Sequence, residues 1–227
     1  METEDSYMFQ GFSEDSYRFF WELAFNNSRS FFDANRRRYK TVVYEPLRQL
    51  TDLLAPTVSD IDSRLSTRYS HVISHIHRDT RYSRDKSPYR DHAWLGFRLP
   101  GVRTGAGFVL YAEFERVSFG YGMGMYAPNT ELMQALRAPM LARPQGFLKL
   151  IAEPGFAGRF RLEGEAYKRP RYAEAPEGIR PYLNMRSMSF SYSSPELRRT
   201  MRPELADEII EGFLLLKPVY RFLMGLD

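Results

Sequence analysis

The sequence predicts a single α+β domain, with helices near its N-terminus, a central antiparallel sheet and helices near its C-terminus. Three observations carry this prediction. Apolar residues recur at helical spacing in the first sixty residues, aromatic and β-branched segments broken by glycine fill residues 92–125, and helical spacing returns after residue 129. The 227 residues are 43% hydrophobic, which is enough apolar surface for one large core. We place the domain at residues 13–227 and an N-terminal extension at residues 1–12.

Three helices are expected before the sheet. The first begins after Ser13, because serine is a favoured N-cap and two carboxylates follow it in the first turn. The second begins after Ser28. The third covers about residues 38–55, where the apolar positions that trace one face are Val42, Val43, Leu47, Leu50, Leu53 and Leu54. Pro46 lies inside this third stretch, so we expect a kink or a break there.

The middle third of the chain has the composition of strands. Residues 71–77 are expected to form one strand, because β-branched residues are frequent there. Three more strands are expected near residues 92–99, 107–115 and 118–125. The last of these has glycine at three alternate positions, which are Gly120, Gly122 and Gly124. In a strand all three would lie on one face, where a ligand or another backbone can approach closely.

The C-terminal half is expected to return to helices. The predicted stretches are residues 129–141, 145–152, 195–200 and 203–216, with a last turn after Pro218. Residues 154–181 are rich in glycine, proline and arginine, so we expect them to be irregular or to form short strands. No internal repeat or low-complexity linker interrupts this order.

The segment that says most about function is residues 77–90, which we call the basic loop. Its fourteen residues hold five permanent cations and two carboxylates, for a local net charge of +3: Arg78, Arg81, Arg84, Lys86, Arg90, Asp79 and Asp85. Pro88 and the run of polar residues oppose a helix or a central strand, so we expect a loop. A polar cluster this dense is costly to order unless its charges are paired or face a ligand.

Three interpretations of the basic loop remain open, which are a binding site, an internal ion-pair network and a merely solvated loop. In the first, it is a binding site, because arginine forks bind phosphate and carboxylate groups bidentately. The predicted ligand-binding residues are then Arg78, Arg81, Lys86, Tyr89, Asn27 and Arg137, and the candidates for a catalytic base are Asp79 and Asp85. In the second, the two aspartates hold the arginines in an internal ion-pair network that braces a long loop. The sequence does not choose between a charged site and a charged scaffold.

The four histidines of the chain lie in or beside the basic loop, at positions 71, 75, 77 and 92. A regular strand would place His75 and His77 on one face, where two imidazoles can contribute to a metal site. A bare His-x-His pair is common by chance, and structural histidines that form hydrogen bonds are the simpler interpretation. We therefore predict no metal, with His75 and His77 as the weak candidates, and the cofactor remains unknown.

Composition excludes several classes of chemistry. The chain has no cysteine, so it has no disulfide, zinc–thiolate site, iron–sulfur cluster or cysteine nucleophile. The sequence also lacks Gly-x-x-x-x-Gly-Lys-Ser/Thr, Gly-x-Ser-x-Gly and His-Glu-x-x-His. The acidic N-terminus has no apolar core typical of a secretory signal, and no apolar run is long enough to span a membrane. We expect a cytoplasmic protein without membrane contact, and the oligomeric state remains open.

Charge and composition leave two classes of function. The net charge of +4 permits contact with phosphates but does not demand it. Our first hypothesis is a protein that binds, and in one version acts on, a phosphate- or carboxylate-bearing small molecule. The alternative is a non-enzymatic binding module for protein or nucleic acid, because a second basic patch has interleaved aromatics, as single-strand nucleic-acid surfaces do. The patch comprises Tyr167, Lys168, Arg169, Arg171, Tyr172, Arg180 and Tyr182.

The order of several blocks resembles one known family. The first block runs from Asn26-Asn27 to Tyr39, the second from Ile76 to Arg90, and the later parts are Gly122-x-Gly124-x-Tyr126-x-Pro128, Arg137 and Lys168-Arg169-Pro170. Together they resemble the uncharacterised family called domain of unknown function 2461, over most of the chain from about Gly11 to the last helix. That family usually has tryptophan at the position of Phe31, phenylalanine at Tyr82 and often arginine at His75. The resemblance implies no activity, cofactor or catalytic residue.

Overall fold

The computed structural model of the protein describes residues 8–81, 83–102 and 107–226. The first seven residues of the predicted extension and Tyr82 of the basic loop lie outside the described residues. The elements in chain order are α1 (Glu14–Phe25), α2 (Arg29–Tyr39), a π-helical segment η2 (Lys40–Tyr44), α3 (Glu45–Ile61), α4 (Tyr69–Val72), β1 (Ala93–Phe97), β2 (Val109–Phe114), β3 (Phe119–Gly124), α5 (Thr130–Ala142), α6 (Pro144–Ala152), α7 (Pro154–Arg159), β4 (Arg161–Glu163), α8 (Arg180–Leu183), β5 (Ser189–Ser194), a 3-10 helix η3 (Leu197–Met201) and α9 (Leu205–Met224).

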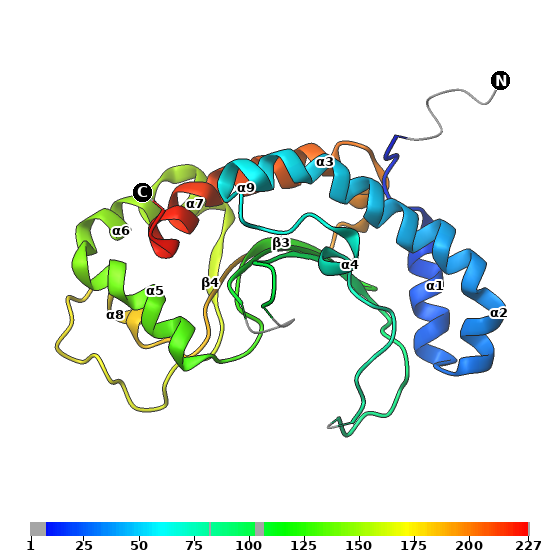
Figure 1. The fold of residues 1–227 in the computed structure, drawn as a ribbon, viewed down its shortest axis with the longest axis horizontal. Coiled ribbons are helices and arrows are strands. Elements are labelled where there is room, and N and C mark those ends of the chain that lie inside the picture. Colours follow the sequence, from blue (N-terminus) through cyan, green and yellow to red (C-terminus); the bar gives the residue numbers. More distant parts are fainter. Residues whose placement is uncertain (1–7, 82, 103–106, 227) are drawn as a thin grey trace.

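The predicted α+β class is confirmed, with an antiparallel sheet between N-terminal and C-terminal helices. The five strands have the order β1-β2-β3-β5-β4, and every neighbouring pair is antiparallel. The long helices α3 and α9 lie side by side above one face of this sheet (Figure 1). Strand alternation turns Leu110, Ala112 and Phe114 of β2 toward these helices, and all three are fully buried. The core therefore lies between the helix pair and this face.

The contact between α9 and the centre of the sheet requires a glycine. The ring of Tyr121 on β3 lies against Gly212 of α9, where a Cβ atom would overlap the ring. The Tyr121 hydroxyl donates a hydrogen bond to Glu208, one turn earlier on α9, at 3.2 Å. The central strand and the longest helix thus pack at close range.

Helix α9 is longer than the sequence predicts. Instead of ending near residue 216 with a separate last turn after Pro218, it continues through Pro218 to Met224. Pro218 cannot donate to the carbonyl of Leu214, but the Leu214 side of the helix is exposed, where solvent can satisfy that carbonyl. Gly225 ends the helix in the left-handed conformation, with a φ of 64°.

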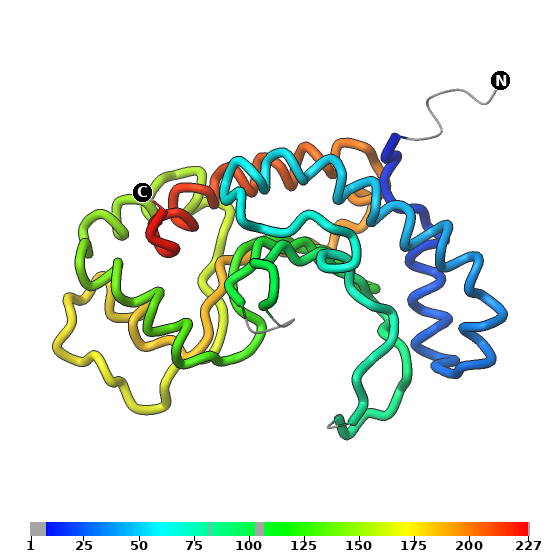
Figure 2. The backbone as a smooth tube through the Cα atoms, in the orientation of Figure 1, coloured from blue at the N-terminus to red at the C-terminus, as the bar shows by residue number. Residues whose placement is uncertain are grey.

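The predicted strand over residues 71–77 is wrong. The chain forms the short helix α4, and then pairs only through the isolated bridges Ile73–Leu95 and His77–Tyr89. The chain leaves β1 after Ser74, whose hydroxyl accepts a hydrogen bond from the Trp94 amide at 3.0 Å. It then pairs with the returning limb of the basic loop, and Figure 2 follows this path out from β1 and back. A strand of β1 length cannot form because the segment changes partner midway.

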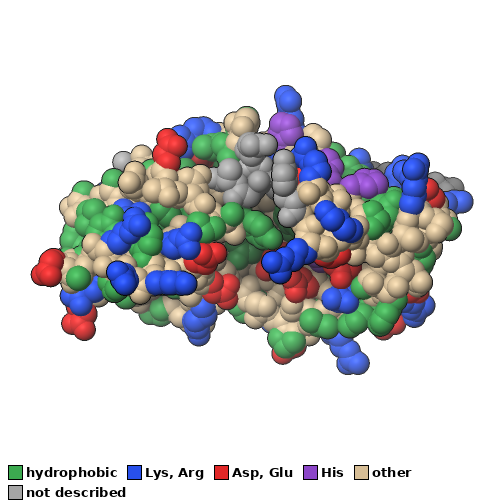
Figure 3. Space-filling model, turned by 90° about the horizontal axis from the view of Figure 1, so that it is seen from below, with side chains coloured by type: hydrophobic (Ala, Val, Ile, Leu, Met, Phe, Trp, Pro, Cys, Tyr) green, Lys and Arg blue, Asp and Glu red, His purple; other side chains and the backbone are tan. Residues whose placement is uncertain are grey.

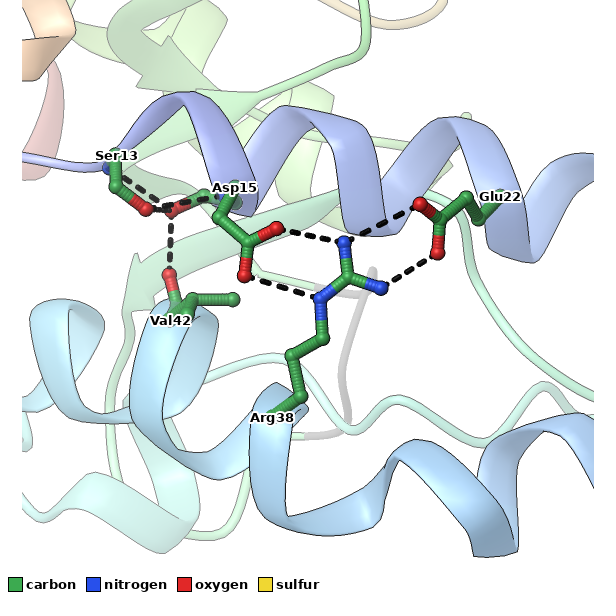
Figure 4. Close-up of polar contacts among 6 residues, drawn as sticks. Ser13, Asp15, Glu22, Arg38 and Val42 are labelled. Carbon is green, nitrogen blue, oxygen red and sulfur yellow. Dashed lines mark hydrogen bonds and ion pairs between the residues drawn. The ribbon is translucent and has the colours of Figure 1, made fainter.

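The predicted break at Pro46 is replaced by a continuous helix. The chain runs from α2 through η2 into α3 with all intervening residues helical. In an α-helix the Val42 carbonyl would accept from residue 46, but proline has no N–H. The Ser16 hydroxyl of α1 donates to this carbonyl instead, at 2.6 Å (Figure 4). A widened turn and a neighbouring hydroxyl therefore accommodate the proline.

An arginine between two carboxylates holds α1 against α2. Arg38 donates to Asp15 from Nε at 3.0 Å and from Nη2 at 2.7 Å, and to Glu22 from Nη1 at 2.5 Å (Figure 4). Its hydrogen bonds lower the pKa of Asp15 below the usual range, against the opposing effect of burial. The side chain of Arg38 is largely shielded from solvent, so this network contributes more than a free surface pair does.

The structure adds detail at the start of the predicted domain and in the region expected to be irregular or to form short strands. Packing begins before residue 13, since Phe9 and Phe12 are buried and the Phe12 ring lies 4.4 Å from that of Phe114. Within residues 154–181, the expected irregular region, the chain forms α7 and the short strand β4 before a long coil.

No helix among the described residues has both the length and the apolar character needed to cross a membrane.

We expect Ser16→Ala to lower the free energy of unfolding by about 1–2 kcal/mol, because it removes the donor to the partly buried Val42 carbonyl and the acceptor of the Ser13 amide. Pro46→Ala in the same background should recover part of this loss by supplying a backbone amide at the position that Val42 needs. Urea unfolding of the single and double variants measures both effects. Ser13→Ala is the control, because it removes a cap of α1 without touching Val42. Equal losses for Ser13→Ala and Ser16→Ala, with no recovery, would contradict this account.

Candidate functional site

The second face of the sheet has no helix layer in the part of the chain that the structure describes (Figure 1). We call it the glycine face. The strand register places the following side chains and glycines on it: Trp94, Gly96, Val109, Tyr111, Glu113, Gly120, Gly122, Gly124, Arg161, Glu163, Ser189, Ser191 and Ser193. Seen from below, the middle of the molecule is recessed, with cationic and acidic side chains around the recess (Figure 3). The prediction that the three β3 glycines share one face is confirmed.

The glycines of β3 make room for side chains of β2. A Cβ atom at Gly122 would lie 2.9 Å from the Tyr111 hydroxyl, and one at Gly120 would lie 3.5 Å from a Glu113 carboxylate oxygen. Both would also press on backbone carbonyls of β5. Tyr111 and Glu113 therefore lie over β3 instead of standing beside it. Absent side chains on one strand thus position polar groups from the next.

Hydroxyl groups line one row of the glycine face. The Tyr111 hydroxyl donates to Ser191 Oγ at 2.7 Å, and Ser191 Oγ donates to Ser189 Oγ at 3.2 Å. Burial raises the pKa of Tyr111 well above its ordinary value, so its hydroxyl remains protonated and keeps its donor role at neutral pH. These three hydroxyls therefore form a hydrogen-bonded row on the glycine face.

Glu113 is a carboxylate of the glycine face, and it lies over β3. No hydrogen bond or ion pair joins it to another described residue, and its side chain is reached by solvent. Enough protein nevertheless surrounds it to raise its pKa to about 6, and the charges of Glu115 and Glu163 add to this effect. A group with a pKa near the working pH can both accept and donate a proton. Glu113 is therefore the residue of the glycine face best suited to proton transfer.

Arg90 connects the basic loop to the glycine face. Its Nη1 donates to the carbonyls of His75, at 2.6 Å, and His77, and its guanidinium lies 5.0 Å from the centre of the Trp94 ring. Nε and Nη2 donate to no residue in the described part of the chain. Burial lowers the pKa of Arg90, and the like charge of Arg78 lowers it further. The bridge between His77 and Tyr89 places Arg78 and Arg90 on the same side of the two paired limbs of the basic loop.

Both carboxylates of the basic loop are paired locally, and Arg84 has no ion pair with another described residue. Arg81 binds Asp79 through two hydrogen bonds of 2.9 and 2.7 Å, Arg78 binds Asp85, and Lys86 donates to a backbone carbonyl. Arg81 holds the pKa of Asp79 at about 2, and hydrogen bonds from Ser87, then from Arg78, lower that of Asp85. Both carboxylates are fully ionised at neutral pH, so they are weak bases. A catalytic role for either stays a prediction.

Two predicted ligand-binding residues anchor the basic loop to α2. Asn27 accepts from the Tyr89 amide at 3.0 Å and donates to the Tyr89 carbonyl at 2.9 Å. Tyr89 is buried, and its ring stacks on that of Phe32 at 4.4 Å. His77 lies against the same two rings. Asn27 and Tyr89 therefore fix the position of the loop, because the Asn27 side chain binds the Tyr89 backbone and the Tyr89 ring packs on α2.

Arg137 lies apart from the basic loop. It is buried, and donates to the carbonyls of Leu183 at 2.8 Å and Met185 at 2.5 Å. Its guanidinium lies 5.6 and 5.2 Å from the ring centres of Tyr167 and Tyr172. It braces the chain around α8, at the opposite end of the sheet from α2 (Figure 1). The structure does not bring Arg137 together with Arg78, Arg81 and Lys86.

The histidines do not form a metal site in the described part of the chain. No group of three or more histidine, aspartate or glutamate side chains there has the arrangement to hold a metal ion. His75 is exposed, and the carbonyls of His75 and His77 bind Arg90.

Side chains of the second basic patch contact residues of the protein itself. Arg171 stacks on Tyr167 at 4.1 Å, and Tyr182 packs edge-on against Phe147.

Four residues of the glycine face were not among the site residues predicted from the sequence. Trp94, Tyr111, Glu113 and Ser191 lie on the glycine face but were not predicted as site residues. Period-2 alternation in the segment 107–115 does place Tyr111 and Glu113 on one face. That this face is shared with the β3 glycines depends on the register of β2 against β3, which the sequence does not display.

The comparison with protein families decides which family the chain is from. The model of the family described as "Conserved hypothetical protein (DUF2461)" matches residues 15–222. The chain belongs to the DUF2461 family. The match runs from α1 almost to the end of α9, so it includes both the basic loop and the glycine face. The resemblance expected from the motifs is thereby confirmed. A search among curated proteins found no match.

We expect Glu113→Gln to stabilise the protein above pH 6 by about 1 kcal/mol, after allowance for solvent screening, and to leave its stability unchanged below pH 4. The pKa is raised in the folded protein, so the native state binds more protons than the unfolded chain. Wild-type stability should therefore fall as pH rises from about 4.5 to about 6, and glutamine removes this fall. Urea unfolding at several pH values measures it.

The matched control for this experiment is Glu177→Gln, which removes an exposed carboxylate from the coil before α8. It should not change the slope of stability against pH in the same window. A Glu113→Gln variant that keeps the wild-type slope would show that the folded state does not perturb this carboxyl.

Proposed function

We propose that the protein binds a phosphate- or carboxylate-bearing small molecule on the glycine face, with the anionic group at Arg78 and Arg90. Two observations carry this proposal. The bridge between His77 and Tyr89 places Arg78 and Arg90 on the same side of the basic loop, and Glu113 on the neighbouring glycine face has no hydrogen bond or ion pair with another described residue. The same molecule would direct hydroxyl or amino donors toward Glu113.

The arginine pair supports the anionic end. Burial is the main cause of the lowered pKa of Arg90, and the like charge of Arg78, which is itself bound to Asp85, lowers it further. An anion placed between the two arginines removes this repulsion and adds charge-assisted hydrogen bonds. Arg90 has Nε and Nη2 left for such bonds, and guanidinium forks match the oxygens of phosphate and carboxylate. Ligand binding would therefore relieve a cost that the free protein bears.

Polar groups of the glycine face support binding of the rest of the ligand, beyond its anionic group. Trp94 and Glu113 are direct cross-strand partners, so both side chains lie on the glycine face, and the Arg90 guanidinium is placed over the Trp94 ring. A carboxylate accepts hydrogen bonds, and Tyr111 and Ser191 carry hydroxyls in the neighbouring row. A ligand with an anionic group alone would not use these groups. A phosphorylated or carboxylated molecule with hydroxyl or amino groups would use both.

Arg81 and Lys86 belong to the outer part of the basic loop in this proposal. Their bonds to Asp79 and to the Thr80 carbonyl are exposed, and exposed pairs contribute little to stability. The net positive charge of the loop would raise the rate at which an anion reaches Arg78 and Arg90. The proposal is one of binding, and Glu113 is the residue that would transfer a proton if a reaction follows.

The alternative, a binding module for nucleic acid or protein, has less support from the contacts. The tyrosines that would stack bases are Tyr167, Tyr172 and Tyr182, and each already contacts an arginine or an aromatic ring. Binding of a fluorescent single-stranded oligonucleotide that weakens steeply with salt would favour this alternative over the small-molecule proposal.

A thermal-shift screen tests the proposal. The compounds are sugar phosphates, nucleoside monophosphates and hydroxy acids, each beside its uncharged parent compound. A ligand that binds only the folded state raises the melting temperature. We expect a shift with one anionic class and none with its parent.

Variants then locate the binding. Arg78→Gln should abolish the shift, Glu113→Gln should reduce it, and Lys149→Gln on α6 should preserve it as a control for loss of an exposed cation. The proposal is wrong if no anionic compound shifts the melting temperature. It is also wrong if the shift is the same in Arg78→Gln as in the wild type.

A further inference from the structure

A second concavity lies on the outer side of the basic loop, against α2. We call it the α2 groove. It has a volume of about 440 Å³ and is lined by Phe32, Arg36, Arg37, Tyr39, Lys40, Ile76 and His77. None of these residues belongs to the glycine face, and neither Arg78 nor Arg90 lines it. Small-molecule sites in proteins span about 300–1,000 Å³, so the groove is large enough for one.

The floor of the groove is apolar. Phe32 and Ile76 are buried residues of the core, and Tyr39 is half-buried beside them. The Phe32 ring lies 5.6 Å from the Tyr39 ring and 5.8 Å from the His77 ring. The floor thus offers ring surfaces from two segments far apart in the sequence. Such a surface favours an aromatic or aliphatic body in the ligand.

The wall of the groove is cationic. Arg36, Arg37 and Lys40 come from the last turn of α2 and the first residue of η2. Arg36 binds Asp33 of its own helix at 2.6 Å. Arg37 and Lys40 have no ion pair with another residue that the structure describes, and no carboxylate lines the groove. The wall therefore has positive charge that nothing beside it neutralises.

A helix end does not explain these cations. Basic residues are common in the last turn of a helix because they complement its exposed carbonyls. Here the helix does not end, since α2 continues through η2 into α3. The Lys40 amide already donates to the carbonyls of Arg36 and Arg37. The cations therefore have no exposed carbonyl row to complement, and their exposed side chains are available to an anion in the groove.

We propose that the α2 groove binds an organic anion with an aromatic or aliphatic body, whose anionic group lies between Arg37 and Lys40. The body contacts Phe32, Tyr39 and Ile76, and the charge is bound at the wall. Burial raises the pKa of Tyr39 to about 12, so its hydroxyl is protonated at neutral pH and presents no negative charge to such a ligand. This site is independent of the one proposed on the glycine face.

Fluorescence titration with 8-anilino-1-naphthalenesulfonate tests this proposal, because the probe has an aromatic body and one anionic group. We expect a single saturable site in the folded protein. The uncharged N-phenyl-1-naphthylamine should bind the wild type more weakly, since it has the same body without the sulfonate. Binding of the two probes with equal affinity would overturn the assignment of the cationic wall.

Charge variants locate the probe. Arg37→Gln combined with Lys40→Gln should weaken sulfonate binding by about tenfold or more, as expected for losing hydrogen bonds to a charged group. It should leave the uncharged probe unaffected. Lys149→Gln is the control for losing an exposed cation, and Arg78→Gln separates this site from the glycine face. Both should bind the sulfonate as the wild type does.

Arg37, Lys40 and Lys149 are exposed, whereas Arg78 is partly buried and bound to Asp85, so circular dichroism with thermal melting is used to confirm that each variant is folded. Unchanged sulfonate affinity in the folded double variant would overturn the proposal, as would several unsaturable sites in the wild type. Loss of binding in Arg78→Gln alone would move the site to the basic loop and would also overturn it.

Discussion

The packing of α9 against one face of the sheet is the contact on which the rest of the structure depends. Tyr121, at the centre of β3, is fully buried against Gly212, and the same helix is bound to α3 by an exposed ion pair of 2.6 Å between Lys217 and Asp60. Each large apolar side chain fully buried here contributes about 1.5–3 kcal/mol. Every strand must therefore turn its apolar positions to this side, and its polar positions and glycines fall on the other.

The glycine face follows from this constraint but is not explained by stability. Each glycine inside a strand costs about 0.5–1 kcal/mol relative to alanine, and β3 has three. Helices on the opposite face offset this cost. What the glycines provide is space for the Tyr111 hydroxyl and the Glu113 carboxylate over the middle strand. A face optimised for folding alone would have β-branched side chains in these positions.

Local patterns in the sequence predict elements well where the deciding interaction is also local. The caps at Ser13 and Ser28 accept hydrogen bonds from amides three residues later, as expected. Period-2 alternation finds β1, β2 and β3 for the same reason. Residues 71–77 defeat the pattern because Ser74 pairs with β1 while His77 pairs with Tyr89. The change of partner depends on tertiary contacts, and no local sequence pattern indicates it.

The site shows the same division between local and distant information. The charges of the basic loop are visible in sequence, and they drew attention to Asp79 and Asp85, but these carboxylates are occupied by neighbours within seven residues. Glu113 is one ordinary glutamate in the sequence. Its raised pKa arises from residues that the sheet brings around it, among them Glu163 of β4, and only the register of the strands reveals that.

Arg90 and Glu113 carry opposite charges near one edge of the sheet, yet they form no pair. The reason lies in what fixes each of them. Arg90 is bound through Nη1 to the His75 and His77 carbonyls and lies over the Trp94 ring, while Glu113 lies over Gly120, across β2 from Trp94. The two charges are thus held by different segments and different neighbours. Both groups keep polar atoms that bind no other described residue, and the proposed ligand would use these atoms.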